Sequence, residues 1–420
     1  MIAPAIDKSV LSDGNEMDWS NPRGRRKLRP SGLRDAISGW LLTRSRATNR
    51  GMELAGFLTL KELVEEVASL MTERQTVRVP VSMLVTVIVL LASLVLGSAC
   101  SSSNGSTSTT KKLKIVYFNA IAANTYTAAN WKGIQEQAKA VGAESVVQFD
   151  AGFDANKQAR QMQDAITTGK YNTFIVEPVD GAVIMPVTQQ AKDAGITVIA
   201  VGSNIASDLA ATAPGVPGTY FIGYAPATNG KQLGQLMSMA CAQKNPCNVV
   251  YMPADLRAAN ENVRKKAAED YIKTQPNMKL IAEPQSGFDA PSGLKAGQDL
   301  VTAHATGVDV IGGSAGQAIA GAVPAFKDAG WIGKVKIISN GATIEECKWI
   351  RDGTLFGAVV QLPYTDGKLA VQDAQDIMNG KTVVPFVDEE SISPIGSKLA
   401  TLETLSTAKG QQFLGEYTDS

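Results

Sequence analysis

The chain has 420 residues, which is more than one average domain requires and enough for two or three. Lys+Arg and Asp+Glu both total 40, so no net charge favours binding to nucleic acid or to an anionic membrane. Apolar residues make up 44% of the chain, enough for a sizeable core. Four Cys and one His exclude most Cys/His zinc sites and leave only His304 for a His-based catalytic pair.

The use of Arg and Lys changes near Cys100. Residues 1–99 contain 10 Arg and 3 Lys, whereas residues 100–420 contain 4 Arg and 23 Lys with 30 acidic residues. Residues 1–70 include a basic cluster of the kind that nucleic-acid sites contain, around Arg25. We interpret them instead as a disordered extension, or as sequence translated from upstream of a start at Met71.

A signal sequence is predicted next. Residues 83–97 carry no charge over fifteen positions, a length typical of a signal-peptide core and short of the roughly 20 residues that span a bilayer. Small residues then precede Cys100, and this arrangement resembles a bacterial lipobox. The resemblance implies that residues 71–99 are a lipoprotein signal peptide and that Cys100 is lipid-modified, with a single transmembrane anchor as the alternative. Residues 100–112 are rich in Ser and Thr and predict a polar tether.

Either kind of anchor places the rest of the chain outside the cytoplasm, in an oxidising compartment. Cys241 and Cys247 flank a short loop with a turn signal, so we predict that they form a disulfide that joins a helix end to the next strand. Separate burial of the two thiols is the alternative. Cys347 is then left single, and we expect it to be buried beside Trp349.

From Leu113 onward, apolar runs typical of strands alternate with helical patterns closed by glycines. The predicted strands are 113–118, 145–149, 173–176, 197–201, 219–222, 248–251, 278–282, 308–312 and 335–339. The predicted helices are 128–141, 155–168, 182–194, 229–242, 258–274, 293–304 and 317–329. This order predicts an α/β fold with parallel sheets covered by helices on both faces. About four strand–helix units in each half indicate two similar Rossmann-like lobes.

Several stretches carry a family resemblance by their order and spacing. They are Asn124-Thr-Tyr-Thr, Trp131-Lys-Gly133, Phe149-Asp150, Glu177-Pro-Val-Asp180, Gly195-Ile-Thr-Val-Ile199, Phe288-Asp289, Thr302-Ala-His304, Gly353-Thr-Leu355 and Gln361-Leu-Pro363. With them, residues 113–400 resemble the type I periplasmic sugar-binding proteins of ABC importers, especially the ribose-binding branch.

The resemblance implies three hinge crossings, near Gly223, Gln361 and Phe386. Lobe 1 is then formed by 113–223 plus 362–386, and lobe 2 by 224–361 plus 387–420. It also implies a monomer without cofactor or metal that captures a small solute in the cleft between the lobes and delivers it to an ABC permease. A receptor that presents a bound signal to a membrane kinase is the alternative.

Sugar sites need planar polar groups at the ring edge and aromatic rings on its faces. Tyr126 and Phe288 match the family's two stacking aromatics, and Arg264 matches its second-lobe arginine, with Arg257 as a competing position. The residues predicted to contact the ligand are Asn119, Asn124, Tyr126, Thr127, Ser203, Arg264, Phe288, Ser314, Asn340 and Gln361. Trp131 is assigned to the core, and His304 receives no role.

The chain departs from the family where sugar binders usually carry charged or strongly polar residues. Gly202 and Ser203 replace an acidic and a basic residue, Ser314 lies where Asn is usual, and Asn340 replaces an Asp. We therefore expect a roomier and more neutral pocket. If Arg264 points inward without a carboxylate partner, it favours an acidic sugar or another small carboxylate.

The motifs of common enzymes are missing from the sequence. The glycine-rich segment 312–316 lacks the Gly-Lys-Ser/Thr ending of a phosphate loop, and no Gly-x-Ser-x-Gly elbow is present. The acids that could suggest glycoside hydrolysis are explained more simply as helix caps and surface groups at strand–helix turns. These acids are Asp150, Asp154, Asp180 and Asp289. We therefore predict a binding protein rather than an enzyme.

Overall fold

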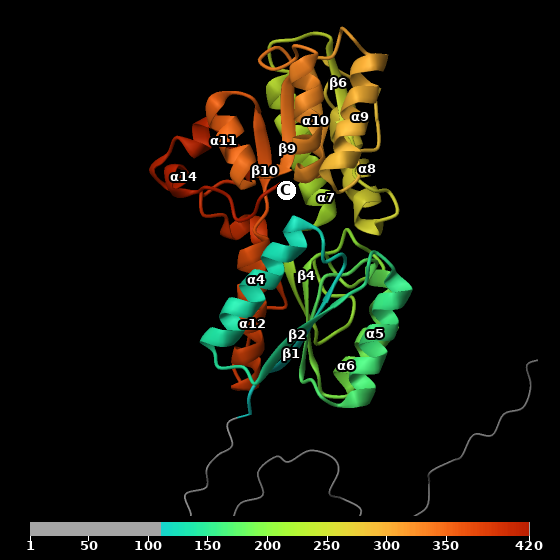
Figure 1. Ribbon diagram of the computed structural model, residues 1–420, viewed down its shortest axis with the longest axis vertical. Helices are drawn as coiled ribbons and strands as arrows, with labels where there is room; N and C mark the ends of the chain where they lie inside the picture. The colour runs from blue at the N-terminus through green and yellow to red at the C-terminus, as the bar shows by residue number, and fades with distance from the viewer. Residues whose placement is uncertain (1–110, 420) are drawn as a thin grey trace, which may run out of the picture. The chain divides into compact units, whose positions relative to one another are not determined.

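The computed structural model describes residues 111–419 (Figure 1). The basic cluster, the predicted signal peptide and Cys100 lie outside the described residues. Within 111–419, no helix has the length and apolar character that crossing a bilayer requires. The described residues form two six-stranded sheets, each with helices on both faces.

The first sheet has the strand order β11-β5-β4-β3-β1-β2, and all its pairings are parallel. Its strands are β1 (Lys114–Asn119), β2 (Ser145–Asp150), β3 (Thr173–Val176), β4 (Thr197–Gly202), β5 (Tyr220–Gly223) and β11 (Phe386–Asp388). Its helices are α4 (Thr125–Ala140), α5 (Ala155–Thr168), α6 (Gly181–Asp193) and α12 (Pro363–Met378). We call this part lobe 1.

Alternating side chains in lobe 1 enter two different cores. On β1, Val116 and Phe118 pack with α5 and α6, whereas Ile115 and Tyr117 pack with α4 and α12. Trp131 belongs to the second of these cores and stacks on Tyr117 at 6.1 Å between ring centroids. The nearly continuous apolar strands of the sequence thus correspond to a sheet buried on both faces.

The second sheet, in lobe 2, has the order β12-β10-β9-β8-β6-β7, and only β12 runs antiparallel to its neighbour. Its strands are β6 (Cys247–Met252), β7 (Met278–Ala282), β8 (Val310–Gly313), β9 (Lys336–Gly341), β10 (Gly357–Val360) and β12 (Leu399–Thr401). Its helices are α7 (Pro226–Ala240), α8 (Ala259–Lys273), α9 (Ala290–Ala303), α10 (Gly316–Asp328), α11 (Ile344–Asp352), α13 (Leu402–Leu405) and α14 (Ala408–Gln412). A 3₁₀ turn, Glu389–Ile392, follows β11.

The fold class predicted from the sequence is correct: two parallel or mostly parallel sheets flanked by helices form the described residues. The element boundaries shift by a few residues. The helix expected from 128 begins at Thr125 because the Asn124 side chain accepts a hydrogen bond from the Tyr126 amide and caps it. The sequence analysis assigned no elements beyond 339, where the structure adds α11, β10, α12 and the short C-terminal elements.

The chain passes between the two sheets three times: after β5, after β10 and after β11. The third passage differs from the expectation of a crossing near Phe386. Phe386 stacks on Phe221 at 5.1 Å, and the strand stays paired with β5 through Asp388. The crossing therefore follows Asp388.

Buried carboxyl groups gather where the chain crosses. Asp366, in the first turns of α12, and Glu389, just after β11, are both fully buried, and they share a hydrogen bond. Glu389 also accepts a hydrogen bond from the Leu362 amide at 3.0 Å. Burial raises the pKa of Asp366 to about 8, with Glu416 and Asp388 adding to the rise. This carboxyl is therefore protonated at neutral pH in the folded chain.

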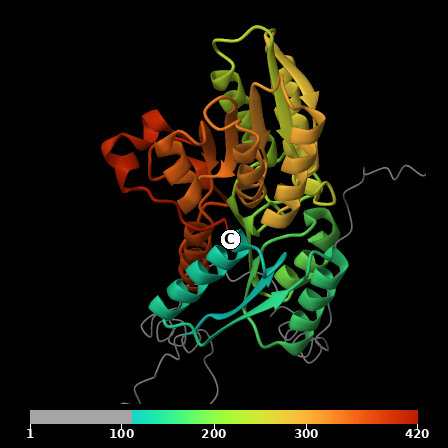
Figure 2. The same cartoon turned by 45° about the horizontal axis from the view of Figure 1, so that its top comes forward.

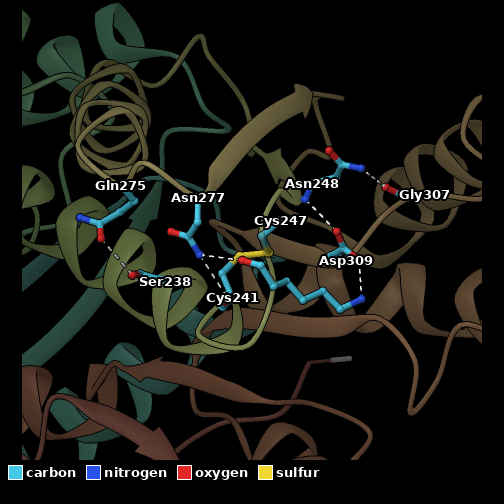
Figure 3. Close-up of a disulfide and its surroundings, with 9 residues drawn as sticks. Ser238, Cys241, Cys247, Asn248, Gln275, Asn277, Gly307 and Asp309 are labelled. Carbon is cyan, nitrogen blue, oxygen red and sulfur yellow. Dashed lines mark hydrogen bonds and ion pairs between the residues drawn. A yellow bond between two sulfur atoms is a disulfide. The ribbon is translucent and has the colours of Figure 1, made fainter.

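A disulfide joins Cys241, at the end of α7, to Cys247, the first residue of β6 (Figure 3). Both residues are fully buried. The Asn277 side chain donates to the carbonyls of Cys241 and Lys244, at 3.1 and 3.0 Å, and so holds the intervening turn from the side. Cys347 is a buried free thiol in the core that Trp349 also contacts.

Glycines allow three pairs of helices to approach closely. Between α4 and α12, a Cβ on Gly133 would lie 2.1 Å from the Tyr364 carbonyl oxygen, and one on Gly367 would lie 2.3 Å from the Asn130 carbonyl. The α7–α8 and α9–α10 pairs have equivalent contacts through Gly230 and through Gly293 and Gly321. These backbone-to-backbone contacts leave no space for even one methyl group.

Gly133→Ala is expected to lower the free energy of unfolding by about 1–3 kcal/mol, because the methyl group must push α4 away from α12. Intrinsic helix propensity acts in the opposite direction, by about 1 kcal/mol in favour of Ala. Denaturant unfolding measures the change. Lys139→Ala, at an exposed position of the same helix, is the control and should change stability little; an equal or higher stability of Gly133→Ala would contradict the close packing.

The raised pKa of Asp366 predicts a pH dependence of stability. Between its ordinary pKa and about 8 the carboxyl is protonated in the folded chain and ionised in the unfolded chain. Each such group lowers the free energy of unfolding by about 1.4 kcal/mol per pH unit as the pH rises through that window. Glu346 and Asp419, with pKa values raised by burial to about 7 and about 8, add to the same trend. The protein should be more stable at pH 5 than at pH 8.

Asp366→Asn keeps the shape of the side chain and removes its titration. Thermal melts from pH 5 to pH 8 should show a smaller loss of stability for this variant than for the wild type. Parallel curves for the two proteins would show that Asp366 is already ionised in the folded state. Asp180→Asn, at an exposed helix cap of lobe 1, is the control.

Candidate functional site

A cavity of about 100 Å³ lies between the two lobes, beyond the carboxyl ends of their strands. Parallel sheets of this kind bind ligands at that edge. Nine of the ten residues predicted to contact a ligand line the cavity: Asn124, Tyr126, Thr127, Ser203, Arg264, Phe288, Ser314, Asn340 and Gln361. The structure therefore brings together side chains that are up to 237 positions apart in the sequence, and both lobes contribute to the lining.

Asn119 is the predicted residue that does not line the cavity. It ends β1 and is fully buried, and its side-chain amide faces Gln148 of the neighbouring edge strand at 3.4 Å. Asn119 is therefore buried within lobe 1, against a side chain of the same sheet, rather than facing the cleft.

Tyr126 occupies the space that a larger residue at position 202 would need. Gly202 ends β4 with φ at +71°, and a Cβ there would lie 2.8 Å from the Tyr126 hydroxyl. A side chain at position 202 would therefore collide with Tyr126. Burial raises the pKa of Tyr126 well above its ordinary value, so the group stays a neutral phenol.

A carboxylate lies at the lobe 1 side of the cavity. Glu177, directly after β3, accepts hydrogen bonds from the Tyr117 hydroxyl at 2.7 Å and from the Thr127 hydroxyl at 3.1 Å. Burial raises the pKa of Glu177, although both hydrogen bonds lower it. Thr127 therefore positions Glu177 as well as lining the cavity.

On the lobe 2 side, Arg264 is the positive charge that lines the cavity, and its side chain is only 2% exposed. Its guanidinium pairs with the buried Glu261 carboxylate and donates to the Tyr224 hydroxyl at 2.7 Å. Burial lowers the pKa of Arg264, but Tyr224 and Glu261 outweigh burial and raise it above its ordinary value. The Nε atom of Arg264 has no hydrogen-bond partner within the described residues.

This pairing overturns the expectation of an acidic ligand. That expectation required Arg264 to lack a carboxylate partner, whereas Glu261 neutralises it and is itself held by the Ser314 hydroxyl and the Ala254 amide. Tyr126 fills the space beside Gly202, so the glycine itself adds no open volume there, and the roomier pocket stays a prediction. Arg257, the competing arginine, pairs with Asp255 on the surface and does not line the cavity.

Phe288 forms an aromatic wall on the lobe 2 side. Its ring packs against Ala254, Ala315 and Ala318 and meets the Phe153 ring of lobe 1 edge-on, 6.0 Å between centroids. Its carbonyl accepts a hydrogen bond from the Asn124 side chain at 3.1 Å, across the cleft.

A second hydrogen bond across the cleft runs from the Gln317 side chain to the Thr125 hydroxyl at 3.0 Å. Together with the Asn124 bond, it joins the helix starts of α10 and α4 over the cavity. The two lobes are therefore in direct contact beside the cavity.

The polar floor of the cavity comes from strand ends and the second crossing. Asn340, at the end of β9, exchanges hydrogen bonds with Asn229 and donates to the Ser314 carbonyl at 2.8 Å. Gln361 accepts a hydrogen bond from the Tyr417 hydroxyl at 3.2 Å. Ser203 follows Gly202 and is nearly buried.

Several residues that line the cavity were not predicted from the sequence to contact a ligand: Phe153, Glu177, Tyr224, Asn260, Gln317 and Tyr417. Glu177 and Tyr224 directly follow β3 and β5, so the rule that ligands meet strand ends could have identified them. Tyr417 lies in the C-terminal segment, beyond every predicted element, and no sequence signal pointed to it.

The acidic residues considered for hydrolysis lie at helix starts. Asp154, Asp180 and Asp289 cap α5, α6 and α9 by accepting hydrogen bonds from backbone amides, and Asp150 does the same in the turn after β2. None of the four lines the cavity. Among residues 111–419, no group of three His, Cys, Asp or Glu side chains is arranged to hold a metal ion. His304 ends α9, away from the cavity.

Comparison with known proteins agrees with this architecture. The ribose import binding protein of Bacillus subtilis is 22% identical over 60% of this chain and 77% of its own length. The corresponding protein of Salmonella typhimurium is 25% identical over 70% of this chain and 93% of its own length.

Two solved structures have the same fold. A Caulobacter myo-inositol binding protein with bound myo-inositol has a TM-score of 0.61 and 21% identity, covering 72% of this chain and 97% of its own. An ABC transporter solute binding protein of Agrobacterium vitis with bound D-fucose has a TM-score of 0.61 and 19% identity. The match covers 72% of this chain and 99% of the Agrobacterium chain. Residues 115–382 match the family described as periplasmic binding protein domain. The chain therefore belongs to the periplasmic binding proteins, a family of binding proteins rather than enzymes.

Proposed function

We propose that this protein binds a small, uncharged cyclic polyol, a sugar or a close relative of one, outside the cytoplasm and delivers it to an ABC permease. One observation supports this most directly. The cavity between the lobes combines two aromatic walls, Tyr126 and Phe288, with amide and carboxylate groups that also line it. Such an arrangement suits a ring with apolar faces and hydroxyls around its edge.

The charges of the site favour a neutral ligand. Arg264 is already paired with Glu261, so it offers hydrogen-bond donors, with Nε among them, rather than an unmatched charge. Glu177 can accept a hydrogen bond from a hydroxyl, and its raised pKa makes it a poor partner for a cation. Asn124, Asn340 and Gln361 supply amides that both donate and accept.

Closure explains how so small a cavity can capture a solute. A typical ligand pocket has about 300–1,000 Å³, well above the 100 Å³ found here. We infer that the lobes part at the three crossings, admit the ligand and close on it with the hydrogen bonds of Asn124 and Gln317. The closed form is the one that a permease distinguishes from the empty, open form.

The sugar proposal is tested by titration calorimetry with four probes: D-ribose, D-allose, D-fucose and myo-inositol. At least one should bind with a dissociation constant in the micromolar range or below. Phe288→Ala should weaken that binding at least tenfold, because it removes one face of the ring site.

Phe149→Ala is the matched control, since Phe149 is a partly exposed aromatic on the outer strand β2 and does not line the cavity. Its binding should equal that of the wild type. Absence of binding for all four probes, with the protein folded, would overturn the proposal. Tight binding of sugar acids alone would also overturn it.

We also propose that the protein is anchored to the outer face of the cytoplasmic membrane through a lipid on Cys100. The support is the order of features in the sequence: an uncharged run of fifteen residues, small residues and then Cys100 before a Ser/Thr-rich tether. An anchored receptor stays near its permease, which raises the local concentration of captured solute.

Labelling with a radioactive fatty acid tests the anchor. The wild-type chain, produced in a bacterium that processes lipoproteins, should incorporate the label, and Cys100→Ser should not. Cys347→Ser is the control, because that buried thiol in lobe 2 is inaccessible to an acyl donor. Equal labelling of wild type and Cys100→Ser would exclude lipidation at this cysteine.

A further inference from the structure

The C-terminal end of the chain returns to the cavity after α14. Figures 1 and 2 both show the red C-terminal segment running back from α14 toward the junction of the two lobes. We call residues 415–419 the strap. None of its residues belongs to a helix or strand, yet Tyr417 and Asp419 are only 5% and 4% exposed.

Lobe 2 holds the strap from both ends. Arg351, on α11, donates to the Gly410 and Phe413 carbonyls at 3.0 and 2.8 Å and so fixes the chain just before the strap. The Phe413 ring is buried in the lobe 2 core. At the other end, the Thr343 hydroxyl donates to the Asp419 carboxylate at 2.7 Å.

Glycines leave the space in which the strap packs against lobe 2. A Cβ on Gly341, the last residue of β9, would lie 2.5 Å from the Tyr417 hydroxyl. A Cβ on Gly316, at the start of α10, would lie 3.0 Å from an Asp419 carboxylate oxygen. Gly415 has φ at +89° and lies against the Thr343 backbone, where a side chain would clash. The strap therefore fills space that the two elements next to the cavity leave open.

The strap also reaches lobe 1. Glu416 accepts hydrogen bonds from the amide and the hydroxyl of Thr365, in the first turn of α12. This helix has no capping side chain of its own at Leu362. A carboxylate at a helix N-terminus is favourable because it meets unsatisfied amides and the positive end of the helix dipole. Glu416 thus caps a lobe 1 helix from a segment seated on lobe 2.

Tyr417 is the strap residue that lines the cavity. Its hydroxyl donates to Gln361 at 3.2 Å, and its ring meets the Tyr126 ring edge-on, 5.8 Å between centroids and 88° between planes. Both partners line the cavity, as Tyr417 itself does. Burial raises the pKa of Tyr417 well above its ordinary value, so the hydroxyl remains a donor and keeps Gln361 oriented.

We propose that the strap is part of the ligand site and that Tyr417 determines which polyols fit. Tyr417 adds a further aromatic side chain to the lining, next to Tyr126, and limits the size of substituents on the ring. Its hydroxyl also orients the Gln361 side chain by donating to the amide oxygen, so that the Gln361 amide nitrogen can donate to a ligand oxygen. This inference rests on the proposed polyol-binding function.

The test compares Tyr417→Ala, Tyr417→Phe and wild type by calorimetry, using whichever of D-ribose, D-allose, D-fucose and myo-inositol binds best, and the O-methyl derivative of that probe. Tyr417→Ala should weaken binding of the probe at least tenfold and reduce the discrimination against its O-methyl derivative. Tyr417→Phe keeps the ring and should weaken binding less while preserving size discrimination. Leu414→Ala, an exposed position just before the strap, is the control and should bind as the wild type does.

Unchanged affinity and unchanged size discrimination in Tyr417→Ala would overturn the inference while leaving the proposed function intact. Failure of the wild type to bind any of the four probes would instead count against the proposed function.

Hydrogen exchange provides a measurement that needs no ligand. The Ile344 amide donates to the Tyr417 carbonyl at 2.9 Å, and the Thr365 amide donates to Glu416 at 3.0 Å. Both amides should exchange slowly in the full chain and at least tenfold faster in a chain that ends at Leu414. Equal exchange rates in the two chains would show that the strap is not docked and would overturn the inference whatever the ligand is.

Discussion

The site depends on one constraint: in a parallel sheet every strand ends at the same edge, so the residues that follow the strands gather there. The two sheets of this protein direct those edges toward each other, and the cavity lies between them. The buried polar groups around the cavity need partners once water is excluded. Arg264 finds Glu261, Asn340 finds Asn229, and Glu177 finds Tyr117 and Thr127. The cavity is therefore lined by side chains already held in place before a ligand arrives.

Much of the fold was predictable because its signals are local. Apolar runs of four to six residues and glycine caps identified the strands and helices from 113 to 339, and the buried faces of β1 follow directly from alternation along the strand. The third crossing, predicted near Phe386, follows Asp388, because β11 stays paired with β5 to that residue. Pairing with a strand more than 160 positions away decides where that element ends.

Individual members of the site were less predictable. Resemblance identified nine lining residues, whereas Asn119 lies outside the lining because its side chain is buried beside Gln148 of the neighbouring strand. The acidic-ligand hypothesis failed for a similar reason. Glu261 lies one helical turn before Arg264, at a spacing that allows an ion pair. The sequence does not show that both side chains are buried, and it is this burial that leaves Arg264 with no unmatched charge for a ligand. Tyr417 reaches the cavity through backbone contacts in an irregular segment, which no periodic pattern reveals.

The glycine contacts between helices have a consequence for motion. Where α4 meets α12, and where α7 meets α8, backbone touches backbone with no side-chain layer to deform. Helices in such contact cannot slide past one another by small rotamer adjustments, so each lobe must travel as one stiff block. Any opening is then concentrated in the three short connecting segments, and a few torsion angles there control the whole displacement. The width of the gap is then set by those torsion angles and not by deformation within either lobe.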